Sequence, residues 1–197
     1  MMDDFLVDAT YTWCLPLLGL MNRPRIAPGG LRELGFVNWV LCRLLSRGAG
    51  VREAHLFSTL ARQRGLFRGW LHFAGRLMPG GVLSRHETEL VILRVAHLRG
   101  CDYELDHHER IGRRCGVGPE VLQRIFAGPA APGWSDAHRA LLAAVDALVA
   151  TRDLGDGEWA ALSRHYGEPQ RIELCMLVGH YELLATTIAA LRIARDL

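Results

Sequence analysis

Apolar residues recur every three to four positions along most of the chain, and no run alternates as a half-buried strand would. Such spacing gathers apolar side chains on one face of a helix, so the chain is predicted to be all-α, with about nine helices and short connections. Clusters of Pro and Gly separate the segments. The expected helices cover residues 5–21, 31–47, 53–63, 66–78, a hairpin within 84–115, 119–127, 135–151, 156–166 and 169–193.

The hairpin at 84–115 is predicted to be two helices that meet at Gly100, and the rest of the chain is expected to pack around it. Ser84 and Glu87 have the spacing of a capping box, which starts the first helix. Helical spacing places Glu89 on the apolar face. A carboxylate that faces a core is costly unless paired, and burial raises its pKa, so Glu89 is predicted to move protons near neutral pH. The alternative is that Glu89 lies at the solvated edge of that face.

On the second helix, Cys101, Glu104 and His108 follow one another at i, i+3 and i+7 and share a face. Cys101 starts the helix, where free N–H groups and the helix dipole favour a thiolate with a lowered pKa. His108 can take or relay a proton. The competing interpretation makes Cys101 a small apolar filler at the helix junction. Neighbouring Tyr103 is expected either to donate a hydrogen bond to a substrate or to be a buried aromatic.

A metal site is the less favoured interpretation. Glu104 and His107 match the Glu-x-x-His pair of dinuclear iron proteins, but the chain has no second such motif. Glu104, His108 and Glu89 could also hold one ion, although one histidine and two carboxylates are a weak signature. We therefore expect a site with no metal and no other cofactor.

Composition limits the classes of protein that remain. A chain of 197 residues, half of them hydrophobic, suits a single domain, with residues 1–80 as an N-terminal helical extension packed on a core of 81–197. A net charge of +2 implies neither a nucleic-acid nor a membrane partner. All the basic residues other than histidine are arginine, which excludes Schiff-base chemistry on a lysine.

The five cysteines and the N-terminus indicate a cytoplasmic protein. The cysteines are scattered, odd in number and without a Cys-x-x-Cys pair, which fits a reducing compartment. Residues 1–21 are apolar but carry three aspartates and no basic residue, unlike a signal peptide or a spanning helix. We expect this segment to form a helix that docks on the body or on a partner subunit.

The hairpin resembles the carboxymuconolactone decarboxylase family, which includes the alkylhydroperoxidase D-like proteins. The pattern of the redox members is a glutamate, eleven residues, Cys-x-x-Cys, three residues and a histidine. Here Glu89, Cys101 and His108 keep that spacing, while Glu104 stands where the second cysteine belongs. The similarity covers roughly residues 25–195 and is densest over 84–115.

The resemblance implies an all-α fold of helical hairpins, assembled as a symmetric oligomer. In the peroxidase members two thiols cycle through a disulfide while the glutamate and histidine relay protons. With Glu104 in this chain, another thiol, such as Cys175 or an external reductant, would have to resolve an oxidised Cys101. The decarboxylase members do not depend on a thiol pair.

Three functions follow. The favoured hypothesis is a thiol-dependent, peroxidase-like oxidoreductase in which Cys101 reacts, His108 and Glu89 relay protons and Glu104 tunes them. The second is a lyase or isomerase acting on a small carboxylate or lactone, in which His108 and Glu89 do acid–base work. The third is a non-catalytic oligomeric family member. For the second hypothesis, the side chains expected to bind the substrate carboxylate are Arg85 and Arg94.

The last helix is apolar nearly all round but carries Glu173, His180 and Tyr181. These residues could line the pocket or lie at a subunit contact, and the contact is the favoured interpretation. The apolar surfaces of this helix and of the N-terminal segment predict a homo-oligomer. The site predicted in the hairpin is expected to bind a small-molecule substrate.

Overall fold

The computed structural model describes residues 23–196. Within that range the chain forms nine helices and no strand, which confirms the all-α prediction; the helix expected at 5–21 lies outside the described residues. The helices are α2 (Leu31–Gly48), α3 (His55–Leu60), α4 (Arg64–Leu77), α5 (Arg85–Leu98), α6 (Asp102–Arg113), α7 (Pro119–Ala127), α8 (Asp136–Thr151), α9 (Asp156–Ser163) and α10 (Glu168–Leu191).

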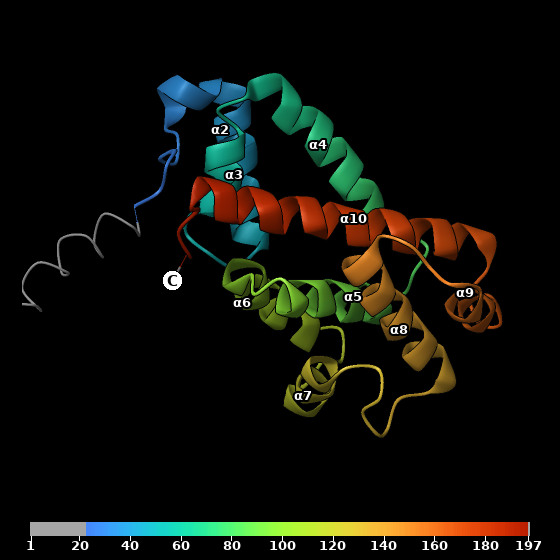
Figure 1. Cartoon of the computed structure of the whole chain (residues 1–197). Coiled ribbons are helices and arrows are strands. Elements are labelled where there is room, and N and C mark those ends of the chain that lie inside the picture. The colour runs from blue at the N-terminus through green and yellow to red at the C-terminus, as the bar shows by residue number, and fades with distance from the viewer. Residues whose placement is uncertain (1–22, 197) are drawn as a thin grey trace, which may run out of the picture.

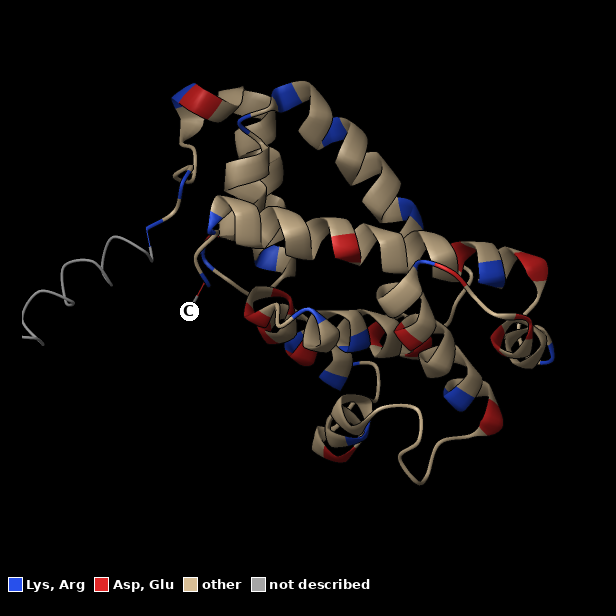
Figure 2. Ribbon diagram, viewed as in Figure 1, with Lys and Arg blue, Asp and Glu red and all other residues tan. Residues whose placement is uncertain are grey.

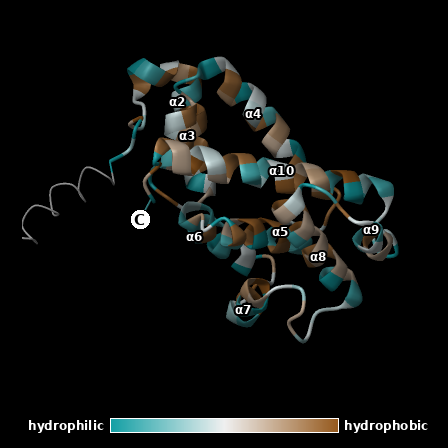
Figure 3. Cartoon of the chain, viewed as in Figure 1, coloured by the Kyte–Doolittle hydropathy of each residue, from teal (hydrophilic) through white to brown (hydrophobic). Residues whose placement is uncertain are grey.

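Helix α5 is the centre of the fold. Every residue from Thr88 to Ala96 is buried, and α6, α7, α8 and α10 all pack against this helix. In Figure 1, α10 crosses the molecule between α2, α3 and α4 on one side and α5, α6 and α8 on the other. Figure 3 shows hydrophobic positions recurring along α5, α8 and α10, whose apolar side chains form the largest core cluster.

The central hairpin forms as its local sequence predicts. Ser84 accepts a hydrogen bond from the backbone of Glu87, and the Glu87 side chain accepts one from the backbone of Ser84, so the capping box is confirmed. Gly100 ends the first helix at φ +58°, a left-handed conformation that favours glycine.

One predicted helix is interrupted. The sequence pattern over 31–47 indicates a continuous helix, but Gly35 adopts φ +73° and ψ +160° inside α2. The strong helical period on both sides of Gly35 hides this break, because the period records which faces are apolar and not whether the backbone stays regular.

Helix α10 lies between the group α2, α3 and α4 and the group α5, α6 and α8. By length and composition alone it could span a membrane, yet in this fold it packs against α4, α5, α8 and α9. Its buried Glu173 accepts hydrogen bonds from the backbone N–H groups of Val82 and Leu83, which fixes the connection between α4 and α5. Acidic and basic residues are spread over the helices in Figure 2, in keeping with the small net charge.

Arg94 is a buried charge in the middle of α5. Its guanidinium bonds both carboxylate oxygens of Asp146 on α8, at 2.7 and 2.8 Å, and donates to the carbonyl oxygens of Ile125 and Phe126 at the end of α7. One side chain therefore holds three helices together.

Replacing Arg94 with Ala should lower the free energy of unfolding by about 3 kcal/mol, because the change strands Asp146 and two carbonyl groups beside the core. Chemical denaturation monitored by circular dichroism measures this change. Arg113→Ala serves as the control, since Arg113 is exposed and reaches Glu109 only at 3.9 Å; it should change stability by less than about 0.5 kcal/mol. Equal losses for the two variants would contradict the structural role of Arg94.

Candidate functional site

The site is built on a buried carboxylate–imidazole pair. Glu89 on α5 has no exposed surface, and its Oε2 lies 2.8 Å from Nδ1 of His108 on α6. Its other oxygen, Oε1, accepts a hydrogen bond of 2.9 Å from Arg85, one turn earlier on α5. The predicted burial of Glu89 beside His108 is therefore confirmed, and the hairpin holds them in register.

The partners of His108 set its charge. Burial by itself lowers the pKa of His108, but the hydrogen bonds and negative charges of Glu104 and Glu89 outweigh burial and raise that pKa to about 9. At neutral pH the ring is therefore an imidazolium. Its Nδ1–H donates to Glu89, which leaves Nε2–H to donate toward the other side of the site.

Two groups meet the Nε2 side of His108. The Tyr181 hydroxyl, from α10, lies 3.1 Å away, and Oε2 of Glu104, from the preceding turn of α6, lies 3.4 Å away. Burial and the nearby Glu104 and Glu89 carboxylates raise the pKa of Tyr181 well above its usual value, so this hydroxyl keeps its proton. When Nε2–H donates to the hydroxyl oxygen, the Tyr181 O–H is free to donate elsewhere.

Glu104 is the unusual member of the group. Its side chain is 5% exposed, and no donor among the described residues reaches its Oε1 atom. A buried carboxylate oxygen without a partner is destabilising, so it identifies a place where a ligand could donate a hydrogen bond.

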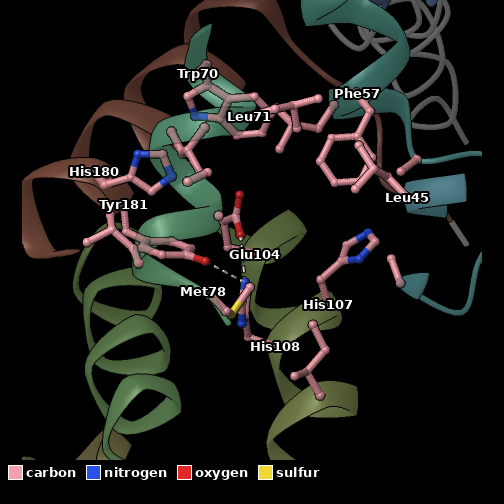
Figure 4. A pocket seen from close by; sticks show the side chains of 18 of the residues that line it. Leu45, Phe57, Trp70, Leu71, Met78, Glu104, His107, His108, His180 and Tyr181 are labelled. Carbon is pink, nitrogen blue, oxygen red and sulfur yellow. Dashed lines mark hydrogen bonds and ion pairs between the residues drawn. The ribbon is translucent and has the colours of Figure 1, made fainter. Parts of the chain in front are cut away.

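These groups face a cavity of about 300 Å³. Figure 4 shows Glu104 pointing into it, with His108 and Tyr181 beneath and Trp70 and Leu71 above. The walls come from α2, α3, α4, α6 and α10 and are mostly apolar. They include Leu45, Leu56, Phe57, Trp70, Leu71, Met78, Ile111 and Leu184.

Cys101 lies apart from this cavity. It occupies the N-cap position of α6 without a capping hydrogen bond from its side chain. It is buried in the core, where it lines a separate surface hollow of about 480 Å³ with residues of α10 and the C-terminal segment. Burial raises the pKa of the Cys101 thiol to about 11, and the charges of Glu104 and Asp102 act in the same direction. The predicted lowering of its pKa is wrong, because desolvation and nearby carboxylates outweigh the helix terminus.

The other predicted site residues have separate roles. Arg94 is held in the core by Asp146 and Arg85 is bonded to Glu89, and neither lines the cavity. Tyr103 borders both hollows, donates a hydrogen bond of 2.6 Å to Asp196 and accepts one from the backbone of Leu56. His180 and Tyr181 line the cavity, whereas the sequence favoured a subunit contact for them. Glu173 accepts hydrogen bonds from the backbone of the α4–α5 connection.

One wall of the cavity depends on a residue that the sequence analysis did not identify. Asp196, near the C-terminus, accepts hydrogen bonds from Tyr103 and from the backbone of His55, and its Oδ2 lies 2.7 Å from Nε2 of His107. His107 and Tyr103 stack with ring centroids 4.8 Å apart. No spacing rule connects a tail carboxylate with α3 and α6, so only the fold reveals this cluster.

Residues 23–196 contain no group of three or more His, Cys, Asp or Glu side chains arranged to hold a metal ion.

Comparison with known proteins identifies the family. Residues 64–147 match the sequence model of the carboxymuconolactone decarboxylase family. No curated protein matches the chain.

Solved structures share the fold at low sequence identity. A peroxidase-related protein from Ralstonia eutropha JMP134, described as an alkylhydroperoxidase AhpD core, is 18% identical, with a TM-score of 0.74 over 87% of this chain and 93% of its own. A peroxidase-related protein from Silicibacter sp. TM1040 is 16% identical, with a TM-score of 0.69 over 79% and 82%.

A third relative has a different activity in its name. A cysteine-to-alanine variant of the debrominase Bmp8, in complex with 2,3,4-tribromopyrrole, is 16% identical, with a TM-score of 0.74 over 86% of this chain and 90% of its own. The match over 64–147, the all-α fold and the Glu89–His108 hairpin agree with one another: residues 64–147 belong to the carboxymuconolactone decarboxylase family, and the chain has an alkylhydroperoxidase D-like fold.

Proposed function

We propose that this protein is an acid–base enzyme of the lyase or isomerase class that moves a proton on a small substrate bound in the cavity. The observation that carries the proposal is Oε1 of Glu104, which is buried, has no donor among residues 23–196 and is adjacent to the protonated His108. A carboxylate in that position is a general base that is already desolvated and held in place.

In the proposed reaction, Glu104 removes a proton from an O–H, N–H or activated C–H bond of the substrate. The electron pair left behind moves to a neighbouring atom, where the Tyr181 hydroxyl donates a proton or a hydrogen bond. Nε2–H of His108 then reprotonates Tyr181, and the proton that Glu104 took from the substrate passes to Nε2 of His108, which restores both groups. Glu89 and Arg85 take no proton in this scheme; they keep His108 charged and oriented.

The thiol-dependent peroxidase is the second candidate, and the peroxidase-related names of two structural relatives favour it. Two features of this chain weigh against it. The raised pKa of Cys101 keeps the sulfur as a weakly nucleophilic thiol, and Cys101 lines a different hollow from Glu104 and His108.

The two candidates separate in one experiment. Wild-type protein in D₂O should speed exchange of ring hydrogens in a panel of small cyclic ketones, lactones and enols, followed by proton NMR. Glu104→Gln should lower that rate about 10²-fold or more, because it removes the general base. Cys101→Ser and the matched control Glu109→Gln, on the outer face of α6, should keep it.

A peroxide assay on the same proteins completes the test. With a dithiol reductant, hydroperoxide consumption should be no faster for wild type than for Cys101→Ser. Fast consumption that disappears in Cys101→Ser, together with exchange that is unchanged in Glu104→Gln, would establish the peroxidase and overturn the acid–base proposal.

The raised pKa of His108 also predicts how stability depends on pH. The folded protein holds the imidazole proton more tightly than the unfolded chain, whose histidine titrates near 6.5. The resulting stability is complete below about pH 6.5 and is lost as pH rises through about 9, a change of about 3 kcal/mol. Denaturation midpoints of wild type should fall over this window, whereas His108→Gln should show a much flatter profile; parallel profiles would contradict the pairing.

We also propose that the protein is a cytoplasmic homo-oligomer. The large apolar side chains Ile172, Met176 and Leu183 recur on one face of α10 and are 66%, 48% and 55% exposed, which suits a subunit contact.

Sedimentation velocity tests the assembly. Met176→Asp should shift the protein toward a smaller species by placing a charge in the contact, whereas Val82→Asp, at an exposed apolar position off α10, should not. A wild-type monomer at micromolar concentration would refute the oligomer.

A further inference from the structure

The cavity is small and mostly apolar, with several aromatic rings in its walls. Its volume of about 300 Å³ is at the lower end for ligand pockets, and Phe57, Trp70 and Tyr181 contribute rings to its walls. Trp70 stacks on His180 with ring centroids 6.0 Å apart, and burial lowers the pKa of His180, so this second histidine is a neutral part of the wall. A single ring with few substituents suits such walls better than a long or branched molecule.

The charges around the cavity leave no site for an anion. Arg85 and His108 are balanced by Glu89 and Glu104. Nη2 of Arg85 is bonded to Glu89, and its Nη1 is buried without a partner among the described residues, but Arg85 does not line the cavity. None of the described residues that line the cavity is an arginine, and residues 1–22 contain no arginine or lysine at all. A substrate carboxylate would therefore lie beside the Glu104 carboxylate without a free cation to balance it.

The Glu104 carboxylate instead favours a ligand group that donates a hydrogen bond. The Glu104 side chain points into the cavity (Figure 4), and its Oε1 atom is buried and accepts no hydrogen bond from any described residue. A ligand O–H or N–H would satisfy this oxygen through a charge-assisted hydrogen bond, which is about twice as strong as a neutral one. The Tyr181 hydroxyl, freed by the donation from Nε2–H of His108, can meet an acceptor on the same ligand.

From these three features we infer that the cavity binds small uncharged ring compounds that carry an O–H or N–H donor, such as phenols, cyclic enols or N–H heterocycles. The inference rests on the proposed acid–base function, because it assigns the proton that Glu104 removes to that donor. It also replaces the small carboxylate of the lyase hypothesis with an uncharged substrate.

Three probes of similar size test this inference by isothermal titration calorimetry on the full-length protein: phenol, anisole and benzoate. Phenol keeps the donor, anisole has it blocked by a methyl group, and benzoate adds a negative charge. Phenol should bind at least 10-fold more tightly than anisole, and benzoate should show no binding at millimolar concentration.

Two variants test whether Glu104 is the group that recognises the hydrogen-bond donor of the ligand. Glu104→Gln should weaken phenol about 10-fold or more by removing the charged acceptor, and leave anisole nearly unchanged. Glu109→Gln makes the same chemical change on the outside of α6 and should bind all three probes as wild type does. Circular dichroism of both variants reports on folding, and the three-probe comparison on wild type stands even if Glu104→Gln fails to fold.

Three results would overturn the inference: benzoate binding as tightly as phenol, phenol and anisole binding alike, or no binding of phenol. Each of these results concerns ligand recognition, and the deuterium-exchange result for Glu104→Gln does not depend on any of them. The acid–base proposal can therefore survive a wrong ligand class, and the donor preference can hold even if no proton transfer is found.

Discussion

The hydrogen bond between Glu89 and His108 is the interaction on which the site depends. A carboxylate with no exposed surface is unstable unless its charge is balanced nearby, and here His108 and Arg85 provide that balance from α6 and from one turn earlier on α5. The pair also links the two helices of the hairpin. The same contact that makes the charged Glu89 tolerable in the core therefore fixes the orientation and protonation of the imidazole.

Helix α10 completes what the hairpin begins. Its apolar residues form much of the main core with α5 and α8, while Tyr181 reaches the free side of His108. On the same helix, Glu173 holds the backbone at Val82 and Leu83, next to the connection whose Met78 lines the cavity. A shift of α10 would therefore disturb the core, the cavity wall and the proton donor together, which couples the stability of the fold to the geometry of the site.

The replacement of a cysteine by Glu104 changes what this site can do. In the family pattern a thiol would stand one helical turn from the histidine. Here that place holds a carboxylate beside an apolar cavity, and one of its oxygens accepts no hydrogen bond from the part of the chain that the structure describes. A carboxylate accepts protons but does not cycle through a disulfide. The remaining cysteine of the motif, Cys101, is turned toward a different hollow, so the chemistry of the hairpin rests on oxygen and nitrogen atoms.

The sequence determined the local helical structure and the part of the site that lies on α5 and α6. Helical periodicity predicted the all-α fold, the capping box and Gly100 set the hairpin, and spacing along α5 and α6 brought Glu89, Glu104 and His108 together. These features depend on residues within two adjacent helices, which is the range over which periodicity is informative.

Only the tertiary structure decided the rest. The burial that raises the pKa of Cys101, the turn of Tyr181 toward His108 and the contact of Asp196 with His107 all depend on where distant helices and the C-terminal segment pack. Desolvation and long-range contacts are properties of the whole fold, and no spacing within one helix encodes them.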